Sequence, residues 1–315
     1  MKKSITKFVL AVGLFAAGVI CIGHAENVSA TKIHLRVSPT GLEHDLNPGD
    51  KVDGTFTVEN DGDNILYYST KATPYYATSK DDSNSIDVSY DKESTFTQIA
   101  NWITFANPEG QIEPNSSIEI KYTINVPEST PGGGQYSALL VTTRDTKNDV
   151  NNNDVSSVSE VASIGPVVYA KVSGNIIEKG EIISNEINGF MFNPPISASS
   201  KVKNTGNVHA KVTYTLRVYP LFSNESIYNN EENPGTATVL PEGTRYYTAS
   251  WTAEQGAPSI GIYKVQSEVK IFDQVSKIEK IVIICPMWVL ILIAVFIIAV
   301  IFWIIARAKG RKTEA

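Results

Sequence analysis

Residues 281–306 form an uncharged, strongly apolar run near the C-terminus. The last 21 of them, residues 286–306, would form a helix about 31 Å long, enough to cross the ~30 Å hydrocarbon layer of a bilayer. Pro286 suits the first turn of a helix, where its missing N–H is not needed, and Trp288 and Trp303 fall near the two interfaces. A helix buried in a soluble core is the alternative, but the length and the flanking charges favour a transmembrane helix at residues 286–306.

A short basic tail, residues 307–315, follows this run and carries Arg307, Lys309, Arg311 and Lys312. Cytoplasmic flanks of membrane helices are enriched in Lys and Arg, so the C-terminus is expected in the cytoplasm and the bulk of the chain outside. We therefore predict a single-pass protein of the cell membrane that contacts the lipid bilayer through this helix. The nine-residue tail is too short to hold a signalling domain.

Residues 1–25 have the layout of a secretory signal peptide, with three early lysines, an apolar run at residues 8–22 and small residues after it. Cleavage fits after Ala25 or after Ala30. An uncleaved anchor helix is an alternative, although the run is short for a bilayer span. Lipid attachment at Cys21 is another, although two β-branched residues precede that cysteine.

Charge and cysteine content limit the partners and the chemistry. The formal net charge of −6 divides into +3 in the first 25 residues, +3 in the last nine and −12 between them. An acidic middle section argues against nucleic acid as a partner, because phosphate binding needs a basic face. Cys21 would leave with the signal peptide and Cys285 lies at the membrane boundary, so the exterior domains must be held by core packing without a disulfide.

The exported region has the alternating pattern of half-buried β-strands. Apolar and polar residues alternate most clearly at residues 118–126 and 210–218. Turns rich in Pro, Gly, Asn and Asp separate such runs, which is typical of a β-sandwich. The further predicted strands are residues 33–37, 52–58, 65–73, 136–143, 161–172, 246–251, 262–271 and 277–284.

The exported region also repeats once. Residues 58–62 resemble residues 202–206 at an offset of 144, whereas Pro114 and Gly134-Gln135-Tyr136 resemble Pro241 and Gly261-Ile262-Tyr263 at an offset of 127. The change of offset places a 17-residue insertion in the first copy, around residues 75–105. We predict an all-β chain with two tandem immunoglobulin-like β-sandwich domains, residues 31–173 and 174–284, in which Tyr136 and Tyr263 form either tyrosine corners or ordinary core contacts.

No motif for catalysis, a cofactor or a metal stands out. His34, His44 and His209 lie in no nucleophile or metal-ligand spacing and are expected at the surface. Residues 132–134 are glycines that precede a strand, so a turn explains them better than a phosphate loop. The acidic segments 81–84 and 151–154 are expected to be solvated loops, with calcium binding left open. We predict a protein that is not an enzyme and has no small-molecule substrate.

Two aromatic clusters are candidate partner-binding residues. Trp102 and Phe105 lie beside the predicted insertion, and Phe190 and Phe192 precede a proline pair. Aromatic clusters on loops can be binding hot spots. The alternative is that they pack between the two domains.

The order of these motifs resembles the WxL-interacting cell-surface proteins of Gram-positive bacteria. The resemblance covers nearly the whole chain, from the signal peptide through residues 48–60, 112–117, 124–127, 132–136, 240–243 and 261–263 to the helix with its basic tail. It implies a membrane-anchored surface protein, a scaffold or adhesin, that binds exported proteins or peptidoglycan. An assembly factor resembling a pilus chaperone is the alternative, since an exposed edge strand in the first domain would complete a partner's sheet.

Overall fold

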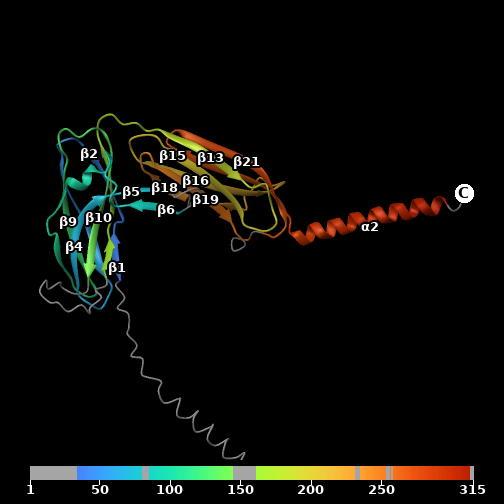
Figure 1. Ribbon diagram of the computed structural model, residues 1–315, viewed down its shortest axis with the longest axis horizontal. Coiled ribbons are helices and arrows are strands. Elements are labelled where there is room, and N and C mark those ends of the chain that lie inside the picture. Colours follow the sequence, from blue (N-terminus) through green and yellow to red (C-terminus); the bar gives the residue numbers. More distant parts are fainter. Residues whose placement is uncertain are drawn as a thin grey trace, which may run out of the picture. The chain divides into compact units, whose positions relative to one another are not determined.

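A computed structural model describes residues 34–79, 85–144, 161–230, 235–252, 256 and 258–312. The signal peptide predicted at residues 1–25 and the acidic segments 81–84 and 151–154 lie outside the described residues. Residues Leu35–Ala315 form one compact unit that holds two β-sandwiches followed by a single C-terminal helix (Figure 1). The predicted fold class, all-β with tandem immunoglobulin-like sandwiches and a C-terminal apolar helix, is confirmed.

The first sandwich consists of two sheets whose strands are joined by ladder hydrogen bonds. One sheet has the order β1-β3-β9-β7, and the other has the order β2-β12-β10-β4-β8, with β11 paired to one end of β10. The bounds are β1 (Leu35–Ser38), β2 (Gly41–Leu46), β3 (Lys51–Asn60), β4 (Leu66–Pro74), β7 (Ile103–Phe105), β8 (Glu109–Ile112), β9 (Ser116–Asn125), β10 (Gly133–Arg144), β11 (Val161–Ile164) and β12 (Val167–Val172).

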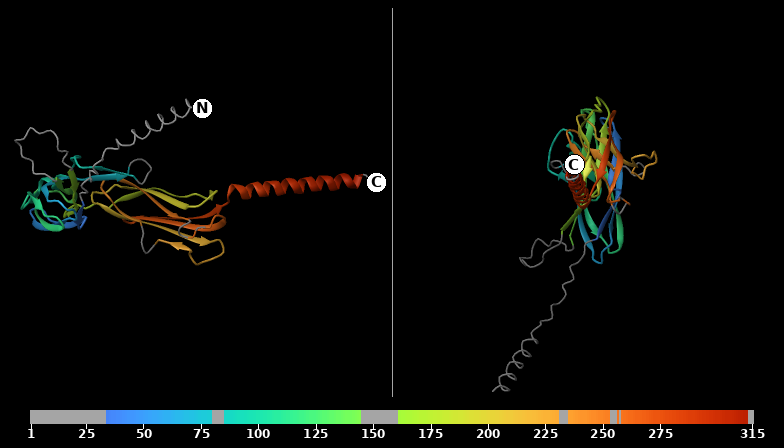
Figure 2. Two further views of the ribbon diagram at one scale, coloured as in Figure 1. Left: turned by 90° about the horizontal axis from the view of Figure 1, so that it is seen from below. Right: turned by 90° about the vertical axis from the view of Figure 1, so that its right-hand side faces the viewer.

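The second sandwich repeats this arrangement with fewer strands (Figure 2). One sheet has the order β13-β15-β19, and the other has the order β14-β21-β20-β16-β17, with β18 also paired to β16. The bounds are β13 (Gly180–Ile187), β14 (Phe190–Met191), β15 (Ile196–Asn204), β16 (Ala210–Pro220), β17 (Tyr228–Asn229), β18 (Gly235–Val239), β19 (Thr244–Trp251), β20 (Gly261–Ile271) and β21 (Gln274–Ile284).

The opening segment of each sandwich changes from one sheet to the other. In the first copy β1 pairs antiparallel with β3, and β2 then pairs parallel with the last strand, β12. In the second copy β13 pairs antiparallel with β15, and β14 pairs parallel with β21. Asn115 and Glu242, which follow the two repeated prolines, both have left-handed backbones with φ of 51° and 63°. The sequence repeat therefore corresponds to a repeat of topology and of backbone conformation.

Period-two alternation builds both cores. Along β9, Ile120, Tyr122 and Ile124 point into the first core, whereas Glu119 and Lys121 are exposed. The second core gathers buried side chains from both of its sheets, among them Trp251, Tyr214 and Leu216. Each sandwich thus buries its own apolar faces, as expected for domains without disulfides.

The insertion around residues 75–105 forms a hairpin and a short helical turn. The hairpin consists of β5 (Tyr76–Ser79) and β6 (Ile86–Ser89), which pair only with each other in the described chain. The 3₁₀ turn η1 (Gln98–Asn101) then leads into β7. The described part of the second sandwich has no counterpart of this hairpin.

One helix follows the last strand almost directly. β21 ends at Ile284 and α2 (Met287–Lys312) begins after Cys285 and Pro286. The Pro286 carbonyl accepts hydrogen bonds from the Val289 and Leu290 amides, 3.0 and 3.4 Å away. Within the described residues this is the one helix long and apolar enough to cross a membrane, over Met287–Arg307.

Candidate functional site

The structure separates the four predicted partner-binding residues into a buried pair and an exposed pair. Trp102 is 9% exposed in the core of the first sandwich, and Phe105 is half-buried against the same core. The Trp102 carbonyl accepts a hydrogen bond from the Asn125 amide at 2.9 Å, which fixes this segment against β9. The turn into β7 directs both rings inward, so the burial of Trp102 and Phe105 argues against an exposed binding surface at these two residues.

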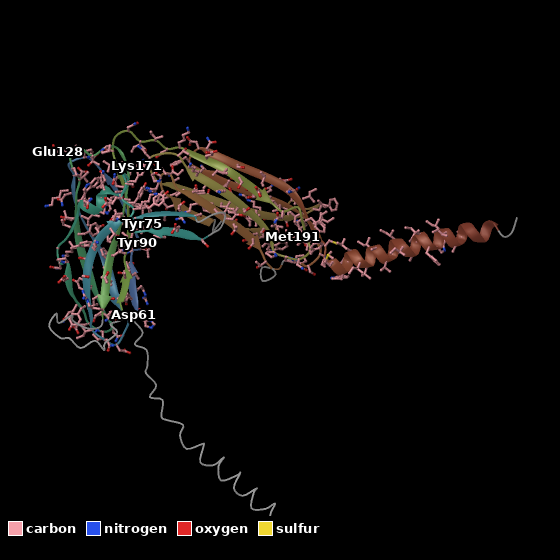
Figure 3. The ribbon with its side chains drawn as sticks, viewed as in Figure 1. Asp61, Tyr75, Tyr90, Glu128, Lys171 and Met191 are labelled. Atoms are coloured by element: carbon pink, nitrogen blue, oxygen red, sulfur yellow. The ribbon has the colours of Figure 1, made fainter. Side chains whose placement is uncertain are left out.

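Phe190 and Phe192 lie at the surface of the second sandwich. They are 49% and 43% exposed, and their rings meet edge to face with centroids 5.3 Å apart. β14, which contains Phe190, pairs with Ile283 and Ile284 at the end of β21. The Cys285 amide also donates a hydrogen bond to the Met191 carbonyl at 3.0 Å. Met191 lies near the start of α2 (Figure 3). The exposed aromatic pair therefore belongs to the end of the sandwich from which α2 starts.

Sequence reasoning missed an aromatic cluster that joins the two sandwiches. This junction cluster consists of Tyr75, Tyr136 and Tyr169 from the first copy and His209 from the second. The Tyr136 ring centroid lies 6.1 Å from that of Tyr169 and 5.8 Å from that of His209, and the Tyr136 hydroxyl is 3.4 Å from His209 Nδ1. Tyr75 adds an edge contact to Tyr169, and Tyr90 packs on Tyr75 (Figure 3).

Backbone groups and a single asparagine reinforce this junction. The Gly134 amide donates to the Asn207 carbonyl at 2.7 Å, and the Asn207 side chain donates to the Asn175 carbonyl and accepts from the Ile177 amide, both at 2.7 Å. A Cβ on Gly132 would lie 2.6 Å from the Asn175 nitrogen. The glycines at 132–134 thus permit close backbone approach between the start of β10 and residues 174–175. The expected turn accounts only for Gly132, since Gly133 and Gly134 belong to β10.

The inserted hairpin contacts an edge strand of the second sandwich. The Thr78 hydroxyl donates to the Thr244 carbonyl at 3.0 Å and accepts from the Thr244 amide at 3.1 Å. The Ser79 hydroxyl accepts from the Tyr246 amide at 2.9 Å. Side-chain hydroxyls therefore satisfy backbone groups of β19 that would otherwise face solvent.

Burial lowers the pKa of the two histidines in the sandwiches. The pKa of His209 is lowered by desolvation, with Lys211 and Lys171 acting in the same direction and the carboxylates of Glu43 and Asp45 opposing it. The pKa of His44 is also lowered by burial, and its Nε2 lies 2.9 Å from the Tyr122 hydroxyl, whose own pKa is raised to about 12. His44 and His209 are half-buried rather than freely exposed, since a tyrosine packs on each ring.

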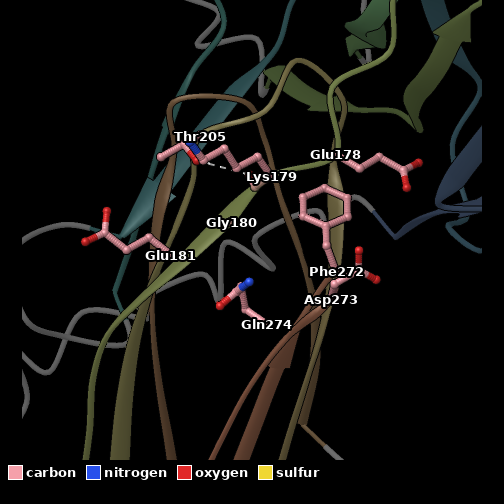
Figure 4. A pocket seen from close by; sticks show the side chains of 8 residues that line it. All are labelled: Glu178, Lys179, Gly180, Glu181, Thr205, Phe272, Asp273 and Gln274. Atoms are coloured by element: carbon pink, nitrogen blue, oxygen red, sulfur yellow. Dashed lines mark hydrogen bonds between the residues drawn. The ribbon is translucent and has the colours of Figure 1, made fainter.

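An open cleft of about 480 Å³ lies at one end of the second sandwich (Figure 4). In it, the Thr205 hydroxyl donates to the Lys179 carbonyl at 3.3 Å. Glu178 is already paired with Lys171 at 3.1 Å. Among the residues that the structure describes, no three His, Cys, Asp or Glu side chains gather closely enough to hold a metal ion. The lining residues are Glu178, Lys179, Gly180, Glu181, Thr205, Phe272, Asp273 and Gln274.

The edge strands of the first sandwich are β1, β7, β2 and β8, none longer than six residues. β1 and β8 have four residues each and β7 has three. The outer side of β12 is occupied by β2 through six paired residues. β2 is therefore the edge of that sheet. Short edge strands offer little backbone for a partner strand to pair with.

No family model and no curated protein match the chain. Among solved structures, the chain is similar to the CsuC–CsuE chaperone–adhesin complex of Acinetobacter baumannii, at 14% identity and a TM-score of 0.37 over 78% of this chain and 98% of that one. It is also similar to the E. coli chaperone DraB, at 14% identity and a TM-score of 0.35 over 78% and 97%. The YadV chaperone gives 11% identity and a TM-score of 0.38 over 78% and 99%. Identities below 25% and TM-scores below 0.5 carry no conclusion about function.

Proposed function

We propose that this chain is a membrane-anchored surface protein whose two sandwiches stand outside the cell and bind exported proteins, cell-wall polymer or both. The observation that carries the proposal is the direct passage from β21 into α2, because only Cys285 and Pro286 separate a folded sandwich from an apolar helix of membrane-spanning length. The basic residues after the helix support a cytoplasmic C-terminus. The resemblance to WxL-interacting proteins supports binding rather than chemistry.

The outer face of the β3–β9 pair is the surface we assign to the partner. Exposed polar side chains alternate along both strands, with Thr57 opposite Glu119 and Asp53 opposite Thr123. The face carries charges of both signs and several hydroxyls, which suits hydrogen bonding to a glycan or to a polar protein surface. It lies on the opposite side of the first sandwich from the sheet that holds Tyr136 and Tyr169.

Strand addition, the pilus-chaperone alternative, is the weaker proposal. It needs an accessible edge long enough to pair with a partner strand. The short edges of β1, β7 and β8 and the cover that β2 gives to β12 favour the scaffold proposal. β2 itself is the longest edge strand of the first sandwich, with six residues, and is the position at which the alternative is tested.

Site-specific photo-crosslinking in intact cells tests both proposals. A photoreactive residue in place of Thr57 reports on the β3–β9 face, one in place of Glu43 reports on the β2 edge, and one in place of exposed Lys277 serves as the control. We expect one discrete protein or glycan adduct at position 57 and none at 277. A discrete adduct at 43 alone would instead support strand addition. Absence of adducts at both 57 and 43 would contradict the binding function.

Membrane orientation is tested separately. A cysteine in place of Val275 should react with a membrane-impermeant maleimide on intact cells, whereas a cysteine in place of Thr313 should react only after the membrane is permeabilised. The reverse pattern would contradict the proposed orientation. Equal labelling at both positions would contradict the membrane span itself.

A further inference from the structure

One end of the second sandwich carries apolar side chains outside the core. The strand register brings four segments to this end. Gly261 of β20 pairs with Ile284 of β21, Pro220 of β16 pairs with Tyr263, and Met191 of β14 pairs with Ile284. The start of β20 and the ends of β16 and β21 therefore lie together with β14, and α2 begins from this same end.

Three of the exposed side chains form a row across neighbouring strands. Phe190, Ile283 and Ile262 occupy paired positions on β14, β21 and β20, and they are 49%, 39% and 45% exposed. Phe222, in the turn after β16, is 98% exposed. A sheet face in water normally presents polar side chains, so such a row indicates a covered surface. We define the membrane-proximal patch as Phe190, Phe192, Phe222, Ile260, Ile262 and Ile283.

The chain length between this patch and α2 is very short. Ile284 and Met287 are three residues apart, so their Cα atoms are separated by at most about 11 Å. Ile283 lies one residue farther back, and Phe190 is its neighbour on the next strand. If α2 enters a bilayer at Met287, Ile283 is tethered within about 14 Å of the membrane surface, and Phe190 lies beside it.

Side-chain character changes along the sheet away from this end. The next cross-strand row contains Ile281, Lys264 and Tyr219, with the Lys264 ammonium 5.0 Å from the centre of the Tyr219 ring. The row after that contains Glu279 and Gln266, joined by a hydrogen bond of 2.6 Å. The first row is apolar, the second adds a lysine and a tyrosine to Ile281, and the third is polar. This is the order expected from the acyl boundary through the headgroups into water.

We propose that the membrane-proximal patch docks onto the lipid surface from which α2 emerges, so that the second sandwich lies against the bilayer. This inference rests on the proposed membrane anchoring by α2. Phe190, Phe192 and Phe222 insert among the headgroups, where aromatic side chains are favoured, and the Lys264 ammonium faces lipid phosphate. The anchor thereby holds the sandwich at two places, the helix and the patch.

Depth-dependent fluorescence quenching of the full chain in phosphatidylcholine vesicles tests this proposal. In a background with Cys21→Ala and Cys285→Ser, single cysteines are introduced as Phe222→Cys, Val275→Cys and Ile297→Cys and labelled with a small fluorophore. Val275 is the matched control, because it is 54% exposed on the same strand as Ile283 but about 26 Å from it. Lipids brominated near the headgroup or near the acyl terminus serve as quenchers.

We expect headgroup-proximal bromines to quench the label at 222 several-fold more than the label at 275. Equal quenching at 222 and 275, with strong deep quenching at 297, would overturn docking while leaving the anchor intact. Loss of deep quenching at 297 would overturn the anchor and docking together. A label at 222 that is protected from aqueous iodide but not quenched by lipid would mean that a second copy of the chain covers the patch, which also overturns the proposal.

Discussion

Asn60 and Asn204 make the same set of hydrogen bonds in the two sandwiches, 144 residues apart. The Asn60 amide donates to the Asn64 carbonyl at 2.8 Å, and the Asn204 amide donates to the Val208 carbonyl at 2.7 Å. Their side-chain oxygens accept from the amides of Gly62 and Gly206 at 3.0 and 2.9 Å. Both side chains are fully buried and fasten the turn after β3 or β15, so the repeated motif preserves a structural device.

Replacing either asparagine should therefore destabilise its own sandwich. Asn204→Ala leaves the Val208 and Val239 carbonyls and the Gly206 amide without their partner, and we expect a loss of about 2–4 kcal/mol in the free energy of unfolding. Urea denaturation of the full chain in detergent measures this. Asn125→Ala, at an exposed position of β9, is the control and should stay within about 0.5 kcal/mol of the parent. Equal effects of the two substitutions would contradict the assigned role.

Gly132→Ala should weaken the junction between the sandwiches. The new Cβ would lie 2.6 Å from the Asn175 nitrogen and 2.7 Å from the Gly174 carbonyl carbon, and backbone cannot move aside as a side chain can. We expect a loss of about 1–3 kcal/mol, typical of overpacking, in the same denaturation assay. Gly41→Ala is the matched control, since its Cβ would meet only Tyr169 Cε2 at 3.8 Å. An unchanged midpoint for Gly132→Ala would show that the linker backbone can shift.

Glu242→Gly should stabilise the second sandwich. Glu242 has a left-handed backbone with φ of 63°, which costs a non-glycine residue about 1–2 kcal/mol. The greater freedom of glycine in the unfolded chain offsets about 0.5–1 kcal/mol of this, so a net gain of about 0.5–1 kcal/mol is expected. Asn115→Gly at the equivalent turn should gain less, because asparagine tolerates this conformation. A larger gain at Asn115 than at Glu242 would contradict the reasoning.

Acid should destabilise the protein through His209. Its folded pKa lies below the ordinary value of 6.5, so between the two values the unfolded chain binds more protons. Stability is therefore full above about pH 6.5 and falls as the pH drops toward the folded pKa of His209. Thermal unfolding of His209→Gln between pH 7.5 and 5 should show a shallower pH dependence than the parent. Part of the slope should remain, because the pKa of His44 is lowered as well.

His34→Gln provides the control for this experiment, since His34 is exposed. Glu43 and Asp45 face His209 from the first sandwich and raise its pKa, whereas Lys171 and Lys211 lower it. Glu43→Gln should therefore steepen the acid loss, and a shallower slope in that variant would contradict the electrostatic account.

Strands with strong alternation were predictable from the sequence, and strands built from small or polar residues were not. Residues 118–125 of the first predicted strand lie in β9, with Val126 just beyond its end, and residues 210–218 fall within β16. β15 was missed because Ala198 and Ser200 face inward, and such small side chains give no apolar signal even though both are buried. The strand predicted at residues 161–172 is broken into β11 and β12, because Gly165 packs directly on the Leu139 carbonyl.

The candidate site was less predictable than the fold. Tyr263 packs edge-on against Trp251 in the second core, which fits the ordinary-core alternative for the repeated Gly-x-Tyr motif. Tyr136 occupies the same place in the repeat but faces His209, 73 residues away in sequence. The contact depends on how one sandwich covers the other, and alternation within a single strand carries no information about that. Trp102 is instead buried in the core of its own sandwich, and Phe190 lies exposed beside the end of β21, which a short aromatic motif does not distinguish.

The continuity of β21 with α2 also decides how the protein would carry mechanical load. A bound partner would pull on the second sandwich at Gly180, which lies beside Ile271 at one end of the β20–β21 ladder. The helix would pull at Ile284, at the other end of that ladder. The pull would then run along the strands, so the hydrogen bonds of the β13–β15 and β20–β21 ladders would have to rupture together rather than one after another. Under such a load the second sandwich would be pulled in shear, a geometry that resists unfolding.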